Sequence, residues 1–209
     1  MPVQEDYNAW AWQYDSSENK TRDLEAFALS NAIGKLKFDS CLELGCGTGK
    51  NTRFLLSRAS RVVAVDFSKE MLAIAREKLR EQPVNFIQAD IAKPWNIATQ
   101  AFDLITFSLV LEHIEDLNHV FSEASLRMKP NGFLYLGELH PFKQYTGSKA
   151  RFENTKGTTV LSCFTHNISD FTQVAKSHGF SILDIREYFD ENDQGNIPRI
   201  LSLLFRFGA

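Results

Sequence analysis

The segment Leu42-Glu43-Leu44-Gly45-Cys46-Gly47-Thr48-Gly49-Lys50 places three glycines at alternate positions. A short apolar run at 39–44 precedes the glycines, and an amphipathic stretch at 50–59 follows them. This order predicts a strand, a glycine loop and a helix. Glycine allows a sharp turn and lets a ligand approach the backbone without a Cβ clash, so the loop is a candidate binding site. A tight turn without a ligand is the alternative.

Outward from this segment, short apolar runs alternate with amphipathic stretches. We expect strands at 39–44, 61–66, 84–89, 102–107 and 133–139, with helices at 50–59, 68–79 and 117–128. Strands that alternate with helices of this length form parallel βαβ units, so the pattern predicts an open α/β sandwich. The tail adds a helix at 169–178 and strand candidates at 180–188 and 197–207, joined by a polar connection at 189–196. The last strand is therefore expected to be antiparallel.

A length of 209 residues predicts one domain. Residues 1–34 precede the first strand and are expected to form a helical cap. Residues 141–166 lack clear periodicity, and we expect them to be an insertion beside the substrate, because long irregular segments in compact domains usually carry function. This insertion holds aromatic side chains and bases, with four bases and one acid between Lys143 and Lys156.

Composition excludes several classes of protein. The net charge of −3 argues against the large basic footprint of a nucleic-acid binder. The longest nearly apolar stretch, 102–111, is about half a membrane span and contains Asp103, so no membrane span is expected. The three cysteines lie apart in the sequence, which favours a reduced cytoplasmic location over a disulfide framework or a metal site, and we expect no metal.

The spacing of the glycines discriminates between nucleotide ligands. A dinucleotide fingerprint, G-x-G-x-x-G, would require glycine where Lys50 stands, and a P-loop would require glycine at the same position. Glu43 at the mouth of the loop would repel a pyrophosphate. It suits a ligand that carries ammonium and sulfonium charges and no phosphate.

Two further carboxylates end neighbouring strands. Asp66 ends the second strand, where a carboxylate can accept both ribose hydroxyls of a nucleoside; capping of the next helix is the alternative. Asp90 ends the third strand on the same edge, where it can accept from an adenine amino group, or simply form a turn. Met71 and Ile91 are candidates to sandwich the ring, although Met71 alone is equally typical of a helix core.

With these motifs in order, the chain resembles the class I S-adenosylmethionine-dependent methyltransferases, in the branch that includes the ubiquinone and menaquinone enzymes and other small-molecule methyltransferases. The resemblance runs from roughly Tyr14 to Leu139. It is carried by the glycine loop, then Val65-Asp66-Phe67-Ser68, Ala89-Asp90, Leu111-Glu-His113-Ile-Glu-Asp116 and Lys129-Pro-Asn-Gly132. It implies a Rossmann-like fold with helices on both faces of a seven-stranded, mostly parallel sheet whose last strand is reversed.

The resemblance also implies S-adenosylmethionine as cofactor and S-adenosylhomocysteine as product. Arg22 would pair with the carboxylate of the cofactor, Tyr14 would close the site, and Ser108 and Leu109 would face its methionine part. An ordinary solvated helix start is the alternative for Arg22. The expected cofactor-binding residues are Tyr14, Arg22, Glu43, Gly45, Cys46, Gly47, Gly49, Asp66, Phe67, Met71, Ala89, Asp90, Ile91, Ser108 and Leu109.

The expected reaction is methyl transfer to an oxygen or nitrogen atom of a small molecule, anionic or aromatic in keeping with the insertion. Methyl transfer is an in-line displacement in which the protein mainly aligns the reactants, and a base matters only for a protonated nucleophile. The candidate bases are His140, His166 and His113, each with packing as the alternative. A catalytically silent cofactor-binding protein and a nucleotide-dependent oxidoreductase stay open, and so does a homodimer.

Overall fold

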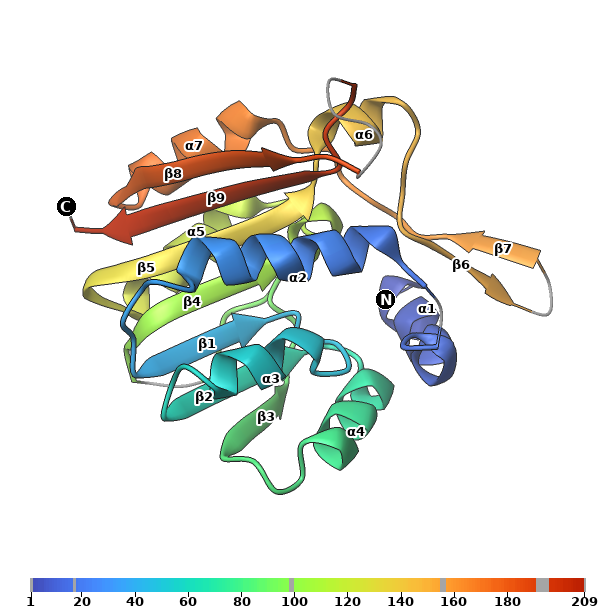
Figure 1. The fold of residues 1–209 in the computed structure, drawn as a ribbon, viewed down its shortest axis with the longest axis horizontal. Helices are drawn as coiled ribbons and strands as arrows, with labels where there is room; N and C mark the ends of the chain where they lie inside the picture. Colours follow the sequence, from blue (N-terminus) through green and yellow to red (C-terminus); the bar gives the residue numbers. More distant parts are fainter. Residues whose placement is uncertain (1, 17, 98–99, 155–156, 191–195, 209) are drawn as a thin grey trace.

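A computed structural model describes residues 2–16, 18–97, 100–154, 157–190 and 196–208, and its centre is a seven-stranded sheet (Figure 1). The strand order is β3-β2-β1-β4-β5-β9-β8. Only β9 runs antiparallel to its neighbours β5 and β8, whereas the other pairings in this sheet are parallel. The expected open sandwich with a reversed last strand is confirmed. The strands are β1 (Ser40–Leu44), β2 (Arg61–Asp66), β3 (Val84–Gln88), β4 (Phe102–Ser108), β5 (Met128–Leu139), β8 (Phe180–Tyr188) and β9 (Ile200–Phe207).

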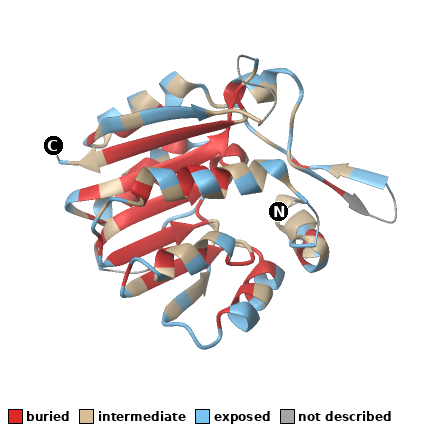
Figure 2. Cartoon of the chain, viewed as in Figure 1, coloured by how far each residue is buried: buried red, intermediate tan, exposed pale blue. Residues whose placement is uncertain are grey.

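Helices cover both faces of the sheet, as expected. On one face lie α2 (Lys20–Ile33), α3 (Lys50–Leu56) and α4 (Lys69–Lys78). On the other lie α5 (Leu117–Leu126) and α7 (Ile168–Ser177). The central strands are buried along their length, as Figure 2 shows, because both faces of a parallel sheet are covered.

Alternation along β1 explains how one strand serves both layers. Leu42 and Leu44 point into the core beneath α5 and α7, whereas Cys41 packs in the core beneath α2 and α3. Successive side chains of a strand point to opposite faces, so Glu43 lies on the α2 and α3 side, where Thr52 hydrogen-bonds to it. The strand thereby delivers a carboxylate next to the glycine loop.

Two regions differ from the expectation. The expected turn at 129–132 lies inside β5, because Met128 already pairs with Phe102 before the register shifts and Phe133 pairs with Leu104. The segment 141–166, expected to be irregular, contains helix α6 (Pro141–Tyr145) and a hairpin of β6 (Arg151–Asn154) and β7 (Gly157–Val160). Of the polar connection expected at 189–196, residues 191–195 lie outside the described residues.

The N-terminal segment, expected as one cap, holds two helices with different neighbours. Helix α2 packs Leu29 and Ile33 into the sheet core. Helix α1 (Pro2–Trp10), followed by a short 3-10 helix η1 (Ala11–Gln13), lies against α4 and reaches the hairpin, where Trp10 stacks on Phe152 at 5.2 Å between ring centroids. In Figure 1, α1 and the hairpin flank the end of the sheet where the parallel strands finish. Among the described residues, no helix has the length and apolar character of a membrane span.

Candidate functional site

A cavity of about 290 Å³ opens where the parallel strands β1, β2, β3 and β4 end. In open α/β sheets, ligands bind outside the carboxyl ends of the strands, so the location is that of a binding site. Of the fifteen expected cofactor residues, eleven line it: Tyr14, Gly45, Gly47, Asp66, Phe67, Met71, Ala89, Asp90, Ile91, Ser108 and Leu109. Arg22, Glu43 and Cys46 line a small adjoining cavity, and Gly49 lines neither.

The three glycines of the loop have positive φ angles but different tasks. Gly45 has a φ of 79°, and a Cβ there would lie 2.7 Å from Val110. Gly47 has a φ of 53°, and a Cβ would meet nothing within 4 Å, so its backbone borders open cavity space. Gly49, at 81°, begins helix α3 and packs near Leu79. The first two glycines shape the cavity, whereas the third serves helix packing.

Asp66 joins the loop to the cavity. Its Oδ2 accepts from the backbone N–H of Gly47 at 2.8 Å, and its Oδ1 accepts from that of Ser68, also at 2.8 Å. Burial raises the pKa of Asp66 to about 6, while these backbone hydrogen bonds work in the opposite direction. Each carboxylate oxygen has a second acceptor site, so Asp66 can still receive two hydroxyl groups.

Asp90 lies further along the same cavity. Its Oδ1 accepts from the backbone N–H of Ala92 at 3.0 Å. Its Oδ2 is buried and has no hydrogen bond, although Lys93 Nζ lies 3.3 Å away as an ion-pair partner. A buried acceptor without a hydrogen bond is uncommon and calls for an explanation, which a donor group on a ligand would supply.

Glu43 is buried at the opposite end, in the adjoining cavity of about 50 Å³. Burial raises its pKa to about 8, despite the 2.5 Å hydrogen bond that its Oε2 accepts from Thr52. Glu25 of α2 lines the same cavity, and burial raises its pKa to about 7. Sequence reasoning missed Glu25, because nothing in the pattern of α2 indicates that this position faces the loop.

Arg22 and Tyr14 form one unit beside these acids. The Arg22 guanidinium lies 4.0 Å from the centre of the Tyr14 ring, and its Nη1 donates to the Tyr14 carbonyl. A guanidinium over an aromatic face is stabilised by a cation–π interaction. Tyr14 lines the large cavity, the small adjoining cavity and a further cavity described below, so the pair stands where these cavities meet.

The three candidate histidines differ in position and in contacts, and of these described residues only His113 lines the large cavity. His113 lines the large cavity; its Nε2 lies 2.8 Å from the Tyr7 hydroxyl, and its Nδ1 lies 3.0 Å from the Ser162 carbonyl oxygen. His140 is fully buried; its Nδ1 accepts from the Phe142 N–H at the start of α6, and its Nε2 contacts Glu187 at 3.1 Å. Burial lowers the pKa of His140.

His166 contacts the Ile114 carbonyl oxygen through Nε2 at 2.7 Å. Neither His140 nor His166 is among the described residues that line the cavity, so the base candidates are not brought together. Their contacts are those of a helix cap and a loop anchor.

A second cavity of about 250 Å³ adjoins the first and shares Tyr7, Tyr14 and Leu109 with it. Its charged lining comprises four bases and one acid: Arg22, Lys149, Arg151, Arg199 and Glu112. Arg199 is held by two 2.6 Å contacts to Asp190. Lys149 and Arg151 belong to the insertion, as expected, whereas Lys156 lies outside the described residues.

The N-terminal helix contributes side chains that sequence reasoning missed. Val3 and Tyr7 line the large cavity, and Tyr7 and Trp10 line the second. The spacing of Tyr7, Trp10 and Tyr14 was a usable signal, because residues three and four apart share one face of a helix. From the insertion, Ser162 and Phe164 also reach the large cavity.

Comparison with known proteins agrees with this geometry. Residues 42–136 match the family model described as a methyltransferase domain. A ubiquinone biosynthesis O-methyltransferase of Coxiella burnetii is 31% identical over 157 residues, which cover 72% of this chain and 67% of that protein. A demethylmenaquinone methyltransferase of Lactococcus lactis is 33% identical over 142 residues, 62% of this chain and 55% of that protein.

Solved structures resemble the whole fold. A complex of DhpI with SAH has a TM-score of 0.77 at 24% identity and covers 99% of this chain and 95% of its own. The N-methyltransferase NodS of Bradyrhizobium japonicum, also solved with S-adenosylhomocysteine, has a TM-score of 0.74 at 16% identity and covers 99% of this chain and 97% of its own.

Proposed function

Because the chain belongs to the class I S-adenosylmethionine-dependent methyltransferases, we propose that it methylates an oxygen or nitrogen atom of a small anionic or aromatic molecule. The methyltransferase activity itself follows from the family, which sets aside the silent and the oxidoreductase alternatives. The observation that carries the choice of acceptor is the second cavity, directly beside the first. There Lys149 and Arg151 add positive charge, whereas Arg199 is paired with Asp190 and Arg22 is assigned to the cofactor.

The residues present fit the cofactor. Asp90 Oδ2 is buried without a hydrogen bond, where an adenine amino group would donate. Gly47 borders open space, where a Cβ would intrude on a ligand. The loop has Lys50 where a pyrophosphate-binding turn requires glycine, and Glu43 of the preceding strand suits a positively charged tail.

In this proposal, each end of the site binds one part of the cofactor. Asp66 accepts the ribose hydroxyls, and Met71 and Ile91 flank the adenine. Glu43 faces the ammonium group, and Arg22 pairs with the carboxylate in a charge-assisted contact. When bound, S-adenosylmethionine supplies a methyl carbon on a positively charged sulfur, which leaves as neutral S-adenosylhomocysteine.

The acceptor would enter the second cavity, where aromatic and basic side chains meet. Tyr7, Trp10 and Tyr14 provide flat apolar surface, and Lys149 and Arg151 provide positive charge. An aligned lone pair of the acceptor forms the new bond to the methyl carbon as the carbon–sulfur bond breaks, and Tyr7 and Tyr14 at the junction exclude water. A hydroxyl acceptor must also lose its proton.

Of the three histidines, we assign to His113 the place beside the methyl acceptor, because it lines the large cavity and its neighbour Glu112 lines the second. A carbonyl oxygen only accepts, so the contact with Ser162 places the proton on Nδ1 and leaves the Nε2 lone pair toward Tyr7 and the cavity. His140 and His166 stay candidates from the sequence alone, and their contacts favour anchoring roles.

The test is a screen with radiolabelled methyl donor against matched acceptors, for example a hydroxybenzoate and its uncharged amide. We expect turnover only with the anion. The double variant Lys149→Glu/Arg151→Glu should raise the KM for the anion about tenfold, since reversing two exposed charges costs about 1–2 kcal/mol in total. Lys37→Glu, at an exposed site near the amino end of β1, is the control. Equal turnover of both acceptors, or an unchanged KM, would refute the proposal.

The other expectations are also proposals. They are a single domain with the insertion 141–166 on the substrate side, a homodimer, a cytoplasmic location and the absence of a nucleic-acid partner. Light scattering of the purified chain tests the dimer directly, and a mass of 23.8 kDa would contradict it.

A further inference from the structure

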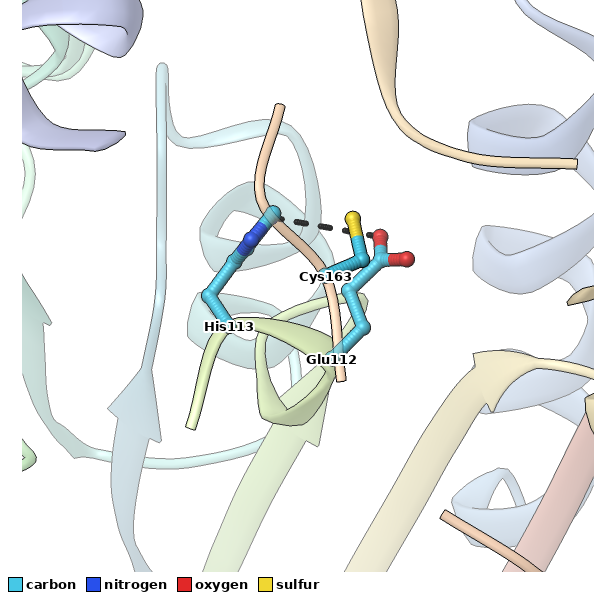
Figure 3. Close-up of side chains that lie close together, drawn as sticks. All are labelled: Glu112, His113 and Cys163. Carbon is cyan, nitrogen blue, oxygen red and sulfur yellow. Dashed lines mark ion pairs between the residues drawn. The ribbon is translucent and has the colours of Figure 1, made fainter. Parts of the chain in front are cut away.

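Glu112, His113 and Cys163 lie close together between the two cavities (Figure 3). Glu112 and His113 are neighbours in a 3-10 helix, η2 (Leu111–His113), and Cys163 arrives from the segment that follows β7. One donor atom from each side chain lies within 4.8 Å of the other two, and His113 Nε2 is 4.0 Å from Glu112 Oε1. An imidazole, a carboxylate and a thiol therefore lie close enough together to be considered as ligands of one ion.

The imidazole of His113 is oriented as a ligand would be. Its Nδ1–H donates to the Ser162 carbonyl at 3.0 Å, which fixes the tautomer and leaves Nε2 as a lone-pair donor toward the cluster. A metal-binding histidine almost always donates its other ring N–H to a carbonyl or carboxylate in this way. The Tyr7 hydroxyl donates to this lone pair at 2.8 Å, so a metal ion would displace Tyr7 from Nε2.

Glu112 adds a buried carboxylate to the cluster. Its side chain is only 7% exposed. Polar atoms near it include His113 Nε2 at 4.0 Å and Gln144 Nε2 at 3.5 Å, the limit for a hydrogen bond, while the Cys163 thiol is directed to the Leu161 carbonyl at 3.6 Å. Buried carboxylates are usually paired with a cation or coordinate a metal, so this environment favours a positively charged ligand.

We propose that Glu112, His113 and Cys163 bind a divalent transition-metal ion of the zinc class, with a fourth position open to the acceptor cavity. One nitrogen, one oxygen and one sulfur suit a borderline ion, whereas magnesium and calcium take oxygen ligands. Bonds of about 2.0–2.3 Å to a tetrahedral ion place ligand atoms about 3.3–3.7 Å apart. A separation of 4.8 Å would have to shrink by about 1.1–1.5 Å, and the 4.0 Å between His113 Nε2 and Glu112 Oε1 by about 0.3–0.7 Å.

The location assigns the ion a role in the deprotonation of the methyl acceptor, and this role rests on the proposed function. His113 lines the cofactor cavity and Glu112 lines the acceptor cavity. A hydroxyl acceptor at the open position would lose its proton to solvent at neutral pH, because the ion lowers its pKa. Its oxygen would then attack the methyl carbon. His113 would act as a ligand instead of a proton acceptor.

The test adds Co²⁺ to the full chain after chelator treatment, under reducing conditions and without cofactor or acceptor. We expect one ion per chain, a thiolate-to-cobalt absorption band in the near ultraviolet, and displacement of Co²⁺ by Zn²⁺. Cys163→Ser should abolish the band, and Glu112→Gln should keep it with affinity weakened about 10- to 100-fold. Cys41→Ala, at a core thiol of β1, is the matched control and should keep both, with circular dichroism verifying the fold of each variant.

Substoichiometric Co²⁺, a missing thiolate band, or a band that survives Cys163→Ser would overturn the metal site. This outcome is separate from the proposed function, because labelled methyl transfer to an anionic acceptor is measured independently. Transfer that persists in the chelated chain without any metal binding would refute only the metal site.

Discussion

Replacement of Glu43 by glutamine should remove most of the pH dependence of cofactor binding. Burial raises the pKa of Glu43 to about 8, so about nine-tenths of the chains hold this carboxyl protonated at pH 7. An ammonium group beside it favours the ionised form, so binding should release about 0.9 proton at pH 7. The apparent affinity should rise about 15- to 20-fold between pH 6 and 7.5, because the ionisation of Glu43 outweighs the partial loss of the proton from a ligand α-amino group of pKa about 7.7–8.0.

The assay is calorimetry with S-adenosylhomocysteine at several pH values and in two buffers of different ionisation enthalpy. Glu43→Gln should bind more weakly at pH 7.5, with a nearly flat pH profile and little proton release. Glu138→Gln is the matched control, since burial also raises the pKa of Glu138 to about 8, but it is not among the described residues of the cavities. This variant should keep the wild-type slope.

Two acidic neighbours of Glu43 could also take up or release a proton on binding, and the test must distinguish them from Glu43. Glu25 and Asp66 add negative charge that raises the pKa of Glu43 further, after burial. Asp66, with a pKa of about 6, contributes only about twofold over this pH range. A slope that persists in Glu43→Gln but disappears in Glu25→Gln would assign the proton to Glu25 and refute the reasoning.

The remaining predictions concern two glycines and the contact between α1 and the β6–β7 hairpin. Gly45→Ala should lower the free energy of unfolding in urea by about 2–4 kcal/mol. Alanine is strained at the φ of 79°, and its Cβ would lie only 2.7 Å from Val110. Gly147→Ala, with a φ of 91° and nothing within 4 Å, should cost only about 1–2 kcal/mol, and equal losses would contradict the packing argument. Trp10→Ala removes the ring stacked on Phe152, and should speed hydrogen exchange in β6 while β1 stays protected; unchanged exchange in β6 would show that the hairpin does not depend on α1.

The sheet was predictable because its signals are local. The β-branched run before Asp66 and the apolar run before Gly45 each indicate a buried strand without reference to distant residues. Asp66 and Asp90 were found for the same reason, since the carboxyl ends of parallel strands meet at one edge. Gly49 shares the motif but packs near Leu79, because the geometry of the loop turns it away from the cavity.

What escaped prediction depends on contacts between distant segments. Tyr7 and His113 are 106 residues apart, and their hydrogen bond arises only because α1 folds over the cavity. Cys163 looked isolated among three scattered cysteines, yet the insertion brings it to Glu112 and His113. His140 has the position of a site residue in the sequence, but its side chain turns inward to begin α6. No local pattern encodes these orientations.

The most direct test of the account is calorimetric titration of S-adenosylmethionine into the wild-type chain, Asp66→Ala and Asp66→Asn. We expect clear binding to the wild type and at least about 100-fold weaker binding to Asp66→Ala, because two hydrogen bonds to a charged group contribute about 1.5–3 kcal/mol each. Asp66→Asn, which keeps one acceptor oxygen, should fall between them. Absence of binding to the wild type, or equal binding to a folded Asp66→Ala variant, would contradict the claim that this loop and this carboxylate hold the nucleoside.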